Sequence, residues 1–424
     1  MNHSSSSPLD STDLSRRDFF ALTAKSAAGL LLLRSASAAA APNDKTTLTW
    51  FMWGNTDAEV NLWKEIAALA QKQVPNLQIN LSTAGWNDYW TKLMMEASSG
   101  GMQAIISIQS QRTPQFASAF QPLDPLVKAQ NFDLKAFDST ILAALTFDGG
   151  LRALPYDFGP YIIFYNKDLF KRDNVQEPKL DWTYDEFMDA AKKLTHGNQY
   201  GFAAFPYPDF CFPFALSNGA TYLNGQGEID VVNAAFVKAF ESYAELVNKH
   251  RVAPQLPATQ DANTAWSLWT AGNAAMVVSG PWDVVNAKSS VKFDFALATI
   301  PKGSKGSITI VGGSGFGISS SLKDPSLAFK AITALTSEEA EERLASAGRA
   351  FPARQAQQAS WYKNAPVGSE EVLNRTLNGG VVPFKTTPNW QQFNLLFVQY
   401  GIPVMNGQTP AATALKEVQE QLSA

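Results

Sequence analysis

The chain has 424 residues, with 34 Lys and Arg, 38 Asp and Glu and a single Cys. Its formal net charge of −4 and the lack of a basic run argue against nucleic acid or an anionic membrane surface as a partner. One cysteine rules out an internal disulfide and a cysteine-based metal cluster, and three scattered histidines offer little for metal binding. We therefore expect no metal and no cofactor.

The first forty residues have the pattern of an export signal. Arg16 and Arg17 form a twin-arginine pair, an apolar stretch follows up to Leu33, and small Ala and Ser residues suited to a signal peptidase come next. The apolar stretch is too short for a permanent membrane anchor, and no Cys is nearby to carry a lipid. We predict that residues 1–40 are a twin-arginine signal peptide and that the mature protein is freely soluble in a periplasm.

The mature sequence opens with an alternation of strands and helices. Apolar residues at every second position predict strands over 47–52, 77–81 and 105–108. Helical spacing of apolar residues predicts helices over 62–74 and 86–98 between them. Strands and helices that alternate at these lengths favour a parallel α/β sheet.

A second α/β pattern begins after Gly149 and Gly150. Strands are predicted over 161–165, 201–205 and 293–300, and helices start at a Thr183–Glu186 capping box, at Asn233 and at Ser337. The mature part contains no internal repeat and no low-complexity linker. Two α/β patterns without a flexible linker predict two lobes joined by short strands, with the chain crossing more than once.

Several motifs of the mature chain occur together in a fixed order. They are LTWFMWG at 48–54, WNDY at 86–89, LPYD at 154–157, FYNKDLF at 164–170, WTYDEF at 182–187 and GPW at 280–282. In this order they resemble the extracellular solute-binding proteins of carbohydrate ABC importers, the group of maltodextrin- and multiple-sugar-binding proteins. The chain departs from the family at 102–105, where Met-Gln-Ala-Ile replaces a Pro-Asp-Val-type step into the third strand.

The resemblance implies an α/β, two-lobed periplasmic-binding-protein (type II) fold with an interlobe cleft and hinge strands. The first lobe would comprise residues 41–152 and 301–348, and the second residues 153–300 and 349–424. A monomeric, non-enzymatic protein of this kind captures a sugar by hinge closure and delivers it to the membrane subunits of an importer.

A sugar site needs aromatic rings for the C–H faces and polar groups for the hydroxyls. Trp282, which follows Gly280 and Pro281, is the first candidate for stacking, because in the family this Trp packs on a sugar. Trp390 is the second. Trp53 and Trp86 are further candidates, for which a structural role is favoured. The other candidate binding residues are Asn55, Asp57, Gln111, Arg112, Asp157, Asp209, Phe210, Gly313, Ser314 and Arg349.

These residues follow predicted strands or crossings. Asn55 and Asp57 leave the first strand at the carboxyl end, where α/β clefts form, and Gln111 and Arg112 leave the third. Asp209 and Phe210 lie in an aromatic, proline-rich segment over 205–214, which is interpreted as a loop. The glycine run at 312–317 lacks the spacing of a dinucleotide-binding loop, so dinucleotide binding is rejected.

Three other functions stay open. Plentiful carboxylates are compatible with a glycoside hydrolase, although the sequence cannot place two of them across a glycosidic bond. Arg112 and Arg349 would suit an anionic solute such as a sulfonated or phosphorylated glycoside. A sensor that feeds a chemoreceptor would use the same binding chemistry.

Overall fold

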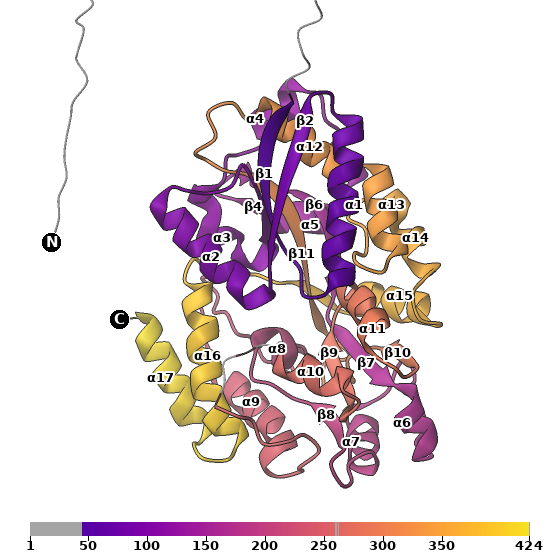
Figure 1. Ribbon diagram of the computed structural model, residues 1–424. Helices are drawn as coiled ribbons and strands as arrows, with labels where there is room; N and C mark the ends of the chain where they lie inside the picture. The colour runs from indigo at the N-terminus through magenta and orange to yellow at the C-terminus, as the bar shows by residue number, and fades with distance from the viewer. Residues whose placement is uncertain (1–44, 259–260, 262, 424) are drawn as a thin grey trace, which may run out of the picture. The chain divides into compact units, whose positions relative to one another are not determined.

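The computed structural model describes residues 45–258, 261 and 263–423. The predicted signal peptide lies outside this part of the chain. Two β-sheets organise the described residues, and each is covered by helices (Figure 1). We call the sheet that contains the first strand, with its helices, the first lobe, and the other sheet with its helices the second lobe.

The first sheet combines parallel and antiparallel strands. Its strands lie in the order β12 (Val381–Pro383), β11 (Thr309–Ile318), β3 (Ile105–Gln109), β1 (Thr46–Trp53) and β2 (Leu77–Ala84), and β6 (Leu154–Pro160) also pairs with β11. β1 is parallel to β2 and β3, as predicted, but β11 runs antiparallel to both β3 and β6. The parallel pairing predicted for the first three strands is therefore confirmed, and the antiparallel strands β11 and β6 complete the sheet.

Helices follow the predicted alternation in the first lobe. They are α1 (Asp57–Gln73), α2 (Trp86–Ser99), α3 (Thr113–Phe116), α4 (Asp124–Ala129), α5 (Ser139–Ala144), α12 (Ser326–Leu335), α13 (Glu338–Ser346), α14 (Gln358–Tyr362) and α15 (Ser369–Gly379). The short strands β4 (Thr146–Phe147) and β5 (Gly150–Leu151) form a hairpin. Helix α1 buries Leu62, Trp63 and Ile66, and its partners include β2, α12 and α13. The buried stripe confirms the helical spacing read from the sequence.

The second sheet has the order β10 (Phe295–Ala298), β7 (Ile162–Asn166), β9 (Ala274–Ser279) and β8 (Tyr200–Ala203). The helices of this lobe are α6 (Lys167–Arg172), α7 (Tyr184–Lys193), α8 (Pro208–Ser217), α9 (Ala234–Asn248), α10 (Thr264–Thr270), α11 (Val284–Ser290), α16 (Trp390–Met405) and α17 (Ala411–Ser423). The capping box of α7 and the Asn233 cap of α9 are confirmed. The segment interpreted as a loop over 205–214 is instead largely α8, which Pro208 begins as a first-turn proline.

The strand pairing places the passage between the lobes at Tyr161. β6 pairs with β11 in the first sheet up to Pro160, and β7 begins the second sheet at Ile162. The passage therefore lies later than the predicted boundary at 152/153. β12 also pairs with β11 of the first sheet, after the predicted return of the chain to the second lobe at 349.

Strand β11 is the centre of the first sheet and is buried along its whole length. Its glycines give it room between β3 and β6: a Cβ atom on Gly315 would lie 2.6 Å from the carbonyl oxygen of Leu154 and 2.9 Å from Cδ1 of Leu145. The glycine run thus serves close strand packing. This agrees with its rejection as a nucleotide-binding loop.

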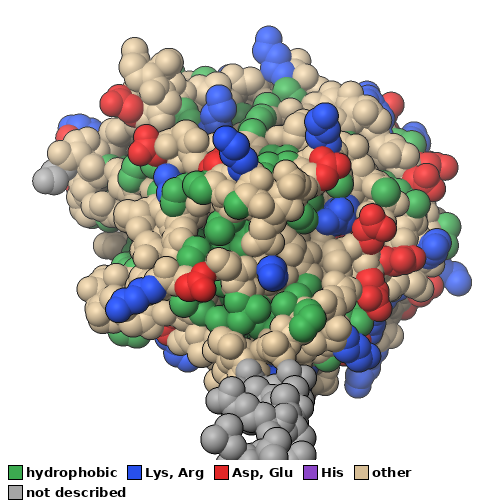
Figure 2. All heavy atoms as spheres, turned by 90° about the horizontal axis from the view of Figure 1, so that it is seen from above, with side chains coloured by type: hydrophobic (Ala, Val, Ile, Leu, Met, Phe, Trp, Pro, Cys, Tyr) green, Lys and Arg blue, Asp and Glu red, His purple; other side chains and the backbone are tan. Residues whose placement is uncertain are grey.

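Figure 2 shows the first lobe from above, with basic and acidic side chains interspersed over this face. Nucleic-acid-binding proteins gather their basic residues on one face instead. On this face, therefore, the basic residues do not gather into a separate patch.

We expect Gly315→Ala to destabilise the protein by about 1–3 kcal/mol, because the added methyl group overpacks the sheet. The measurement is urea unfolding. Gly101→Ala is the matched control, since its Cβ would meet only Ser99 Oγ at 3.5 Å. Equal stability of the two variants would contradict this account of β11.

Candidate functional site

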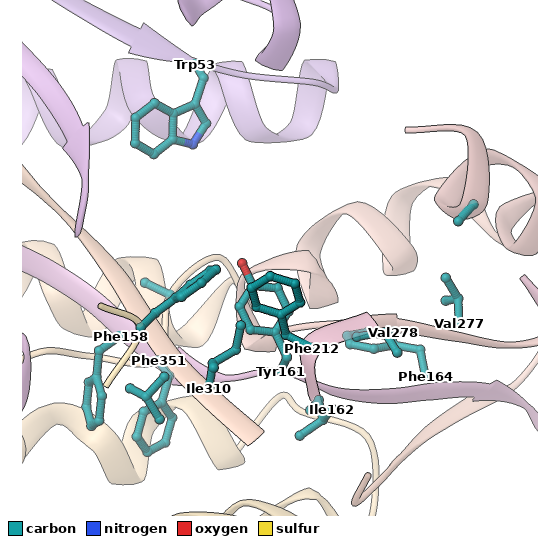
Figure 3. Close-up of a cluster of buried hydrophobic side chains, with 14 of the residues drawn as sticks. Trp53, Phe158, Tyr161, Ile162, Phe164, Phe212, Val277, Val278, Ile310 and Phe351 are labelled. Atoms are coloured by element: carbon teal, nitrogen blue, oxygen red, sulfur yellow. The ribbon is translucent and has the colours of Figure 1, made fainter. Parts of the chain in front are cut away.

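A cavity of about 500 Å³ lies between the two lobes and takes its lining from both. We call it the cleft. The first lobe contributes the end of β1, the start of α1 and the β11 backbone, and the second lobe contributes Tyr161, the start of α8 and the segment around Trp282. In Figure 3 the indole of Trp53 extends from the first lobe, and the hydroxyl of Tyr161 points toward that lobe from below.

Aromatic rings face the cleft from both sides. The lining rings are Trp53, Trp86, Tyr161, Tyr207, Phe210, Trp266 and Trp282. Trp53 and Trp86 pack edge to face at 5.5 Å, and Tyr161 and Trp282 do the same at 5.1 Å. Such pairs hold one ring in place while another face stays available for a ligand.

The position of Trp282 depends on Gly280. A Cβ atom on Gly280 would lie 2.2 Å from Cη2 of the Trp282 indole, so the ring lies directly over the glycine backbone. Pro281 begins a short 3-10 turn that carries the indole, and Trp282 itself stays half-buried. Each residue of the Gly-Pro-Trp motif thus has a role in presenting this ring.

A buried guanidinium organises the first-lobe side of the cleft. Nε of Arg349 lies 2.6 Å from Oε1 of Glu59, and Nη1 lies 3.5 Å from Oδ2 of Asp157. The three side chains are at most 4% exposed. The guanidinium also lies 4.9 Å from the centre of the Trp63 ring. A buried charge needs such partners, so the network fixes α1, β6 and the segment after α13 relative to one another.

Hydrogen bonds link the lobes across the floor of the cleft. Nε2 of Gln111 donates to the hydroxyl of Tyr161 at 3.3 Å, and this hydroxyl donates to Oδ2 of Asp209 at 2.6 Å. Burial raises the pKa of Asp209 to about 6, against the effects of Tyr161 and Arg112. Burial likewise raises the pKa of Asp157 to about 6, although Arg349 acts in the opposite direction.

Two side-chain contacts join the lobes at the rim. Oγ1 of Thr56 donates to Oδ1 of Asn286 at 2.9 Å, and Nδ2 of Asn87 donates to Oδ1 of Asp261 at 2.8 Å. Asn286 in turn donates to Asp283 at 2.9 Å. One of the two contacts between the lobes joins neutral side chains, and the other joins an amide to a carboxylate. Hydrogen bonds of these kinds are individually weak.

Most of the predicted binding residues meet in this cleft. Those that line it are Asn55, Gln111, Asp157, Asp209, Phe210, Trp282, Gly313, Ser314 and Arg349. Asn55 also accepts a hydrogen bond from the Trp86 backbone N–H at 3.0 Å, which joins the loop after β1 to the start of α2. Arg349 is the one cationic residue among the described residues of the lining.

Three predicted residues lie elsewhere. Trp390 is 1% exposed and packs in the second-lobe core against Phe393, so it cannot serve as a stacking platform here. Asp57 is the exposed first residue of α1 and is absent from the lining. Arg112 is buried behind the cleft, with its guanidinium 4.0 Å from the centre of the Trp90 ring and bonded to Gln391.

The structure also adds residues that the sequence analysis missed or assigned to the core. Glu59 replaces Asp57 as the carboxylate of this region, and Trp53 and Trp86 line the cleft although a structural role was favoured for them. Glu59 had a readable signal, because Thr56-x-x-Glu59 has the form of a capping box. Tyr161 had none, since it reads as part of an apolar strand.

Neither a metal site nor a membrane-spanning helix is found within the described residues. No group of three or more His, Cys, Asp or Glu there could hold an ion. No helix of that part of the chain is long and apolar enough to cross a bilayer.

Comparison with known proteins decides the family. The model of the bacterial extracellular solute-binding proteins matches residues 53–342. The chain belongs to this family. Solute-binding proteins of this kind are components of transport systems, and the matched region includes most residues of the cleft.

Relatives and solved structures agree with the family. The chain is 28% identical over 205 residues to a galactooligosaccharide-binding protein and 29% over 210 residues to a maltodextrin-binding protein, both of Bacillus subtilis. The first match spans 45% of this chain and 46% of the relative, and the second spans 46% of this chain and 48% of the relative. The chain thus matches about half the length of each of these two relatives.

The fold matches over most of the chain. A Listeria monocytogenes ABC substrate-binding protein in complex with cycloalternan covers 89% of this chain and 98% of its own, with a TM-score of 0.82 and 23% identity. A maltose/maltodextrin-binding domain from Bdellovibrio bacteriovorus bound to maltotriose covers 89% and 100%, with a TM-score of 0.75 and 18% identity. The predicted two-lobed type II fold is confirmed.

We expect Asp209→Asn to stabilise the ligand-free protein at pH 7.5 by on the order of 1–3 kcal/mol, since one pKa unit corresponds to about 1.4 kcal/mol. The pKa of Asp209 in the folded protein lies above its value in the unfolded chain. Ionisation of this carboxyl therefore lowers the stability of the parent protein as the pH rises from about 4 to 6. The stability gained by Asp209→Asn should vanish below about pH 4, where Asp209 of the parent is protonated in both the folded and the unfolded protein.

Urea unfolding across this pH range measures the effect of Asp209→Asn. Asp189→Asn, at an exposed position of α7, is the control for the loss of one charge and should leave stability unchanged. A variant at 209 that is less stable than the parent at pH 7.5 would contradict the account.

Proposed function

We propose that this solute-binding protein captures a saccharide in the cleft and delivers it to the membrane subunits of an ABC importer. The observation that carries the proposal is the pairing of half-buried aromatic faces with hydrogen-bonding side chains in one cavity. Trp282 and Trp86 offer surfaces for sugar C–H groups, while Gln111, Asp157 and Asp209 offer partners for hydroxyls. The sugars named for the related proteins support the same ligand class.

Capture requires that the lobes separate and close. The passage at Tyr161 and the polar contacts at the rim support hinge closure, because a ligand that touches both lobes stabilises the closed state. We further propose that the protein acts outside the cytoplasm as a monomer after export through its twin-arginine segment. It would bind the sugar without chemical change.

The anionic-ligand alternative loses the support of its two arginines. It rested on Arg112 and Arg349, but Arg112 lies behind the cleft and Arg349 is paired with Glu59 and Asp157. An anion would therefore meet carboxylates and no free guanidinium among the described lining residues. A neutral saccharide fits this lining better.

A thermal-shift screen of sugars, followed by calorimetry on each sugar that stabilises the protein, tests the proposal. We expect Trp282→Ala to weaken binding about fivefold or more, because the lost stacking contact contributes on the order of 1 kcal/mol. Trp390→Phe is the control: it changes the core and should leave affinity unchanged. Unchanged affinity in Trp282→Ala, or release of hydrolysed sugar, would contradict the proposal.

A further inference from the structure

The charges of the cleft are strongly unbalanced. Among the described lining residues the anionic ones are Glu59, Asp157, Asp209, Asp261 and Asp283. They face one cation, Arg349. The imbalance is a property of the cleft, because the whole chain has nearly equal numbers of acidic and basic residues.

The guanidinium of Arg349 pairs with only two of these carboxylates. Arg349 lies closest to Glu59, at 2.6 Å, and contacts only one oxygen of Asp157, at 3.5 Å. The other oxygen of Asp157, Oδ1, is buried and accepts no hydrogen bond of good geometry, although Ser314 lies close enough to lower the pKa of this carboxyl. The residue as a whole is 2% exposed. A buried carboxylate oxygen without a donor is costly unless a ligand supplies one.

Asp209 offers a second acceptor from the opposite lobe. Its Oδ2 is held by the Tyr161 hydroxyl at 2.6 Å, which orients the carboxylate at the start of α8. Arg112, behind the cleft, lowers the pKa of this carboxyl, but it does not line the cavity and offers no donor there. The aromatic faces of Trp282 and Tyr161 add to the attraction for a cation, since ring faces are negative.

We propose that the preferred ligand is a saccharide that carries a protonated amine, with the ammonium group held by Asp209 and Asp157. This inference rests on the proposed function and narrows its substrate class. A neutral sugar would bring no positive charge to Asp157 and Asp209 when the lobes close over them. An ammonium group supplies both the positive charge and the donors that they need.

Matched disaccharides test this inference by calorimetry at pH 7.5. Each set contains the free-amine sugar, its N-acetyl derivative and the parent with a hydroxyl in place of the amine, built on gluco-, galacto- and manno-configured rings. In the set that binds most tightly, we expect the amine to bind on the order of tenfold more tightly than its hydroxyl parent. The preference should shrink when NaCl is raised from about 0.05 to 0.5 M.

Variants of the two carboxylates test whether they cause the preference for the amine. In Asp209→Asn and in Asp157→Asn the amine-to-hydroxyl affinity ratio should fall toward one, whereas Asp189→Asn should keep it. A hydroxyl parent that binds as tightly as the amine, or a ratio that survives both cleft variants, would overturn this inference and leave the sugar-binding proposal intact. If no sugar in any set binds, the proposed function itself fails. The salt series on the unaltered protein remains decisive if a variant does not fold.

Discussion

The buried ion network of Arg349 is the interaction on which the cleft depends. Its guanidinium joins Glu59 at the start of α1 and Asp157 on β6, two segments far apart in the chain. A buried charge with one partner removed commonly costs about 3–5 kcal/mol, so these segments cannot easily shift independently. The network also explains why Arg349 is unavailable to an anionic ligand, although it lines the cleft.

The second lobe contributes the other half of the site. Tyr161 lies where the chain passes between the lobes, and its hydroxyl links Gln111 of the first lobe to Asp209 of the second. Trp282 is held over Gly280 and reaches the same space. Closure would bring these groups against a ligand whose other side meets Trp53 and Trp86. Binding and lobe movement are thus coupled through shared residues.

Local signals in the sequence were sufficient for much of the fold. Apolar alternation identified β1, β2 and β3, and side-chain caps identified the starts of α7, α9 and α13. The antiparallel pairing of β11 with β3 could not be predicted from the sequence. The glycines of β11 form no apolar pattern, and the paired residues are more than a hundred positions apart. Pro208 at the start of α8 was mistaken for a loop signal, although proline suits the first turn of a helix.

The site was predictable where a motif fixed the residue and not where burial decided its role. Trp282 and Asp157 belong to motifs shared with the resembled family, and both line the cleft. Trp390 and Arg112 had suitable chemistry, but long-range packing encloses them. Asp57 was chosen and Glu59 was overlooked. Two positions on a helix differ by more than half a turn, so Glu59 faces the cleft while Asp57 does not.

A lock across the rim tests capture between the lobes most directly. Thr56 and Asn286 already touch at 2.9 Å, and the single native cysteine, Cys211, is buried. Thr56→Cys with Asn286→Cys therefore introduces one new cysteine pair between the lobes for a disulfide or short cross-linker. The protein is loaded with a sugar found by screening, oxidised, desalted and then reduced. The account predicts that sugar stays with the oxidised protein and emerges intact on reduction. Loss of the sugar from the locked protein at the same rate as from the open one, or recovery of cleaved sugar, would contradict it.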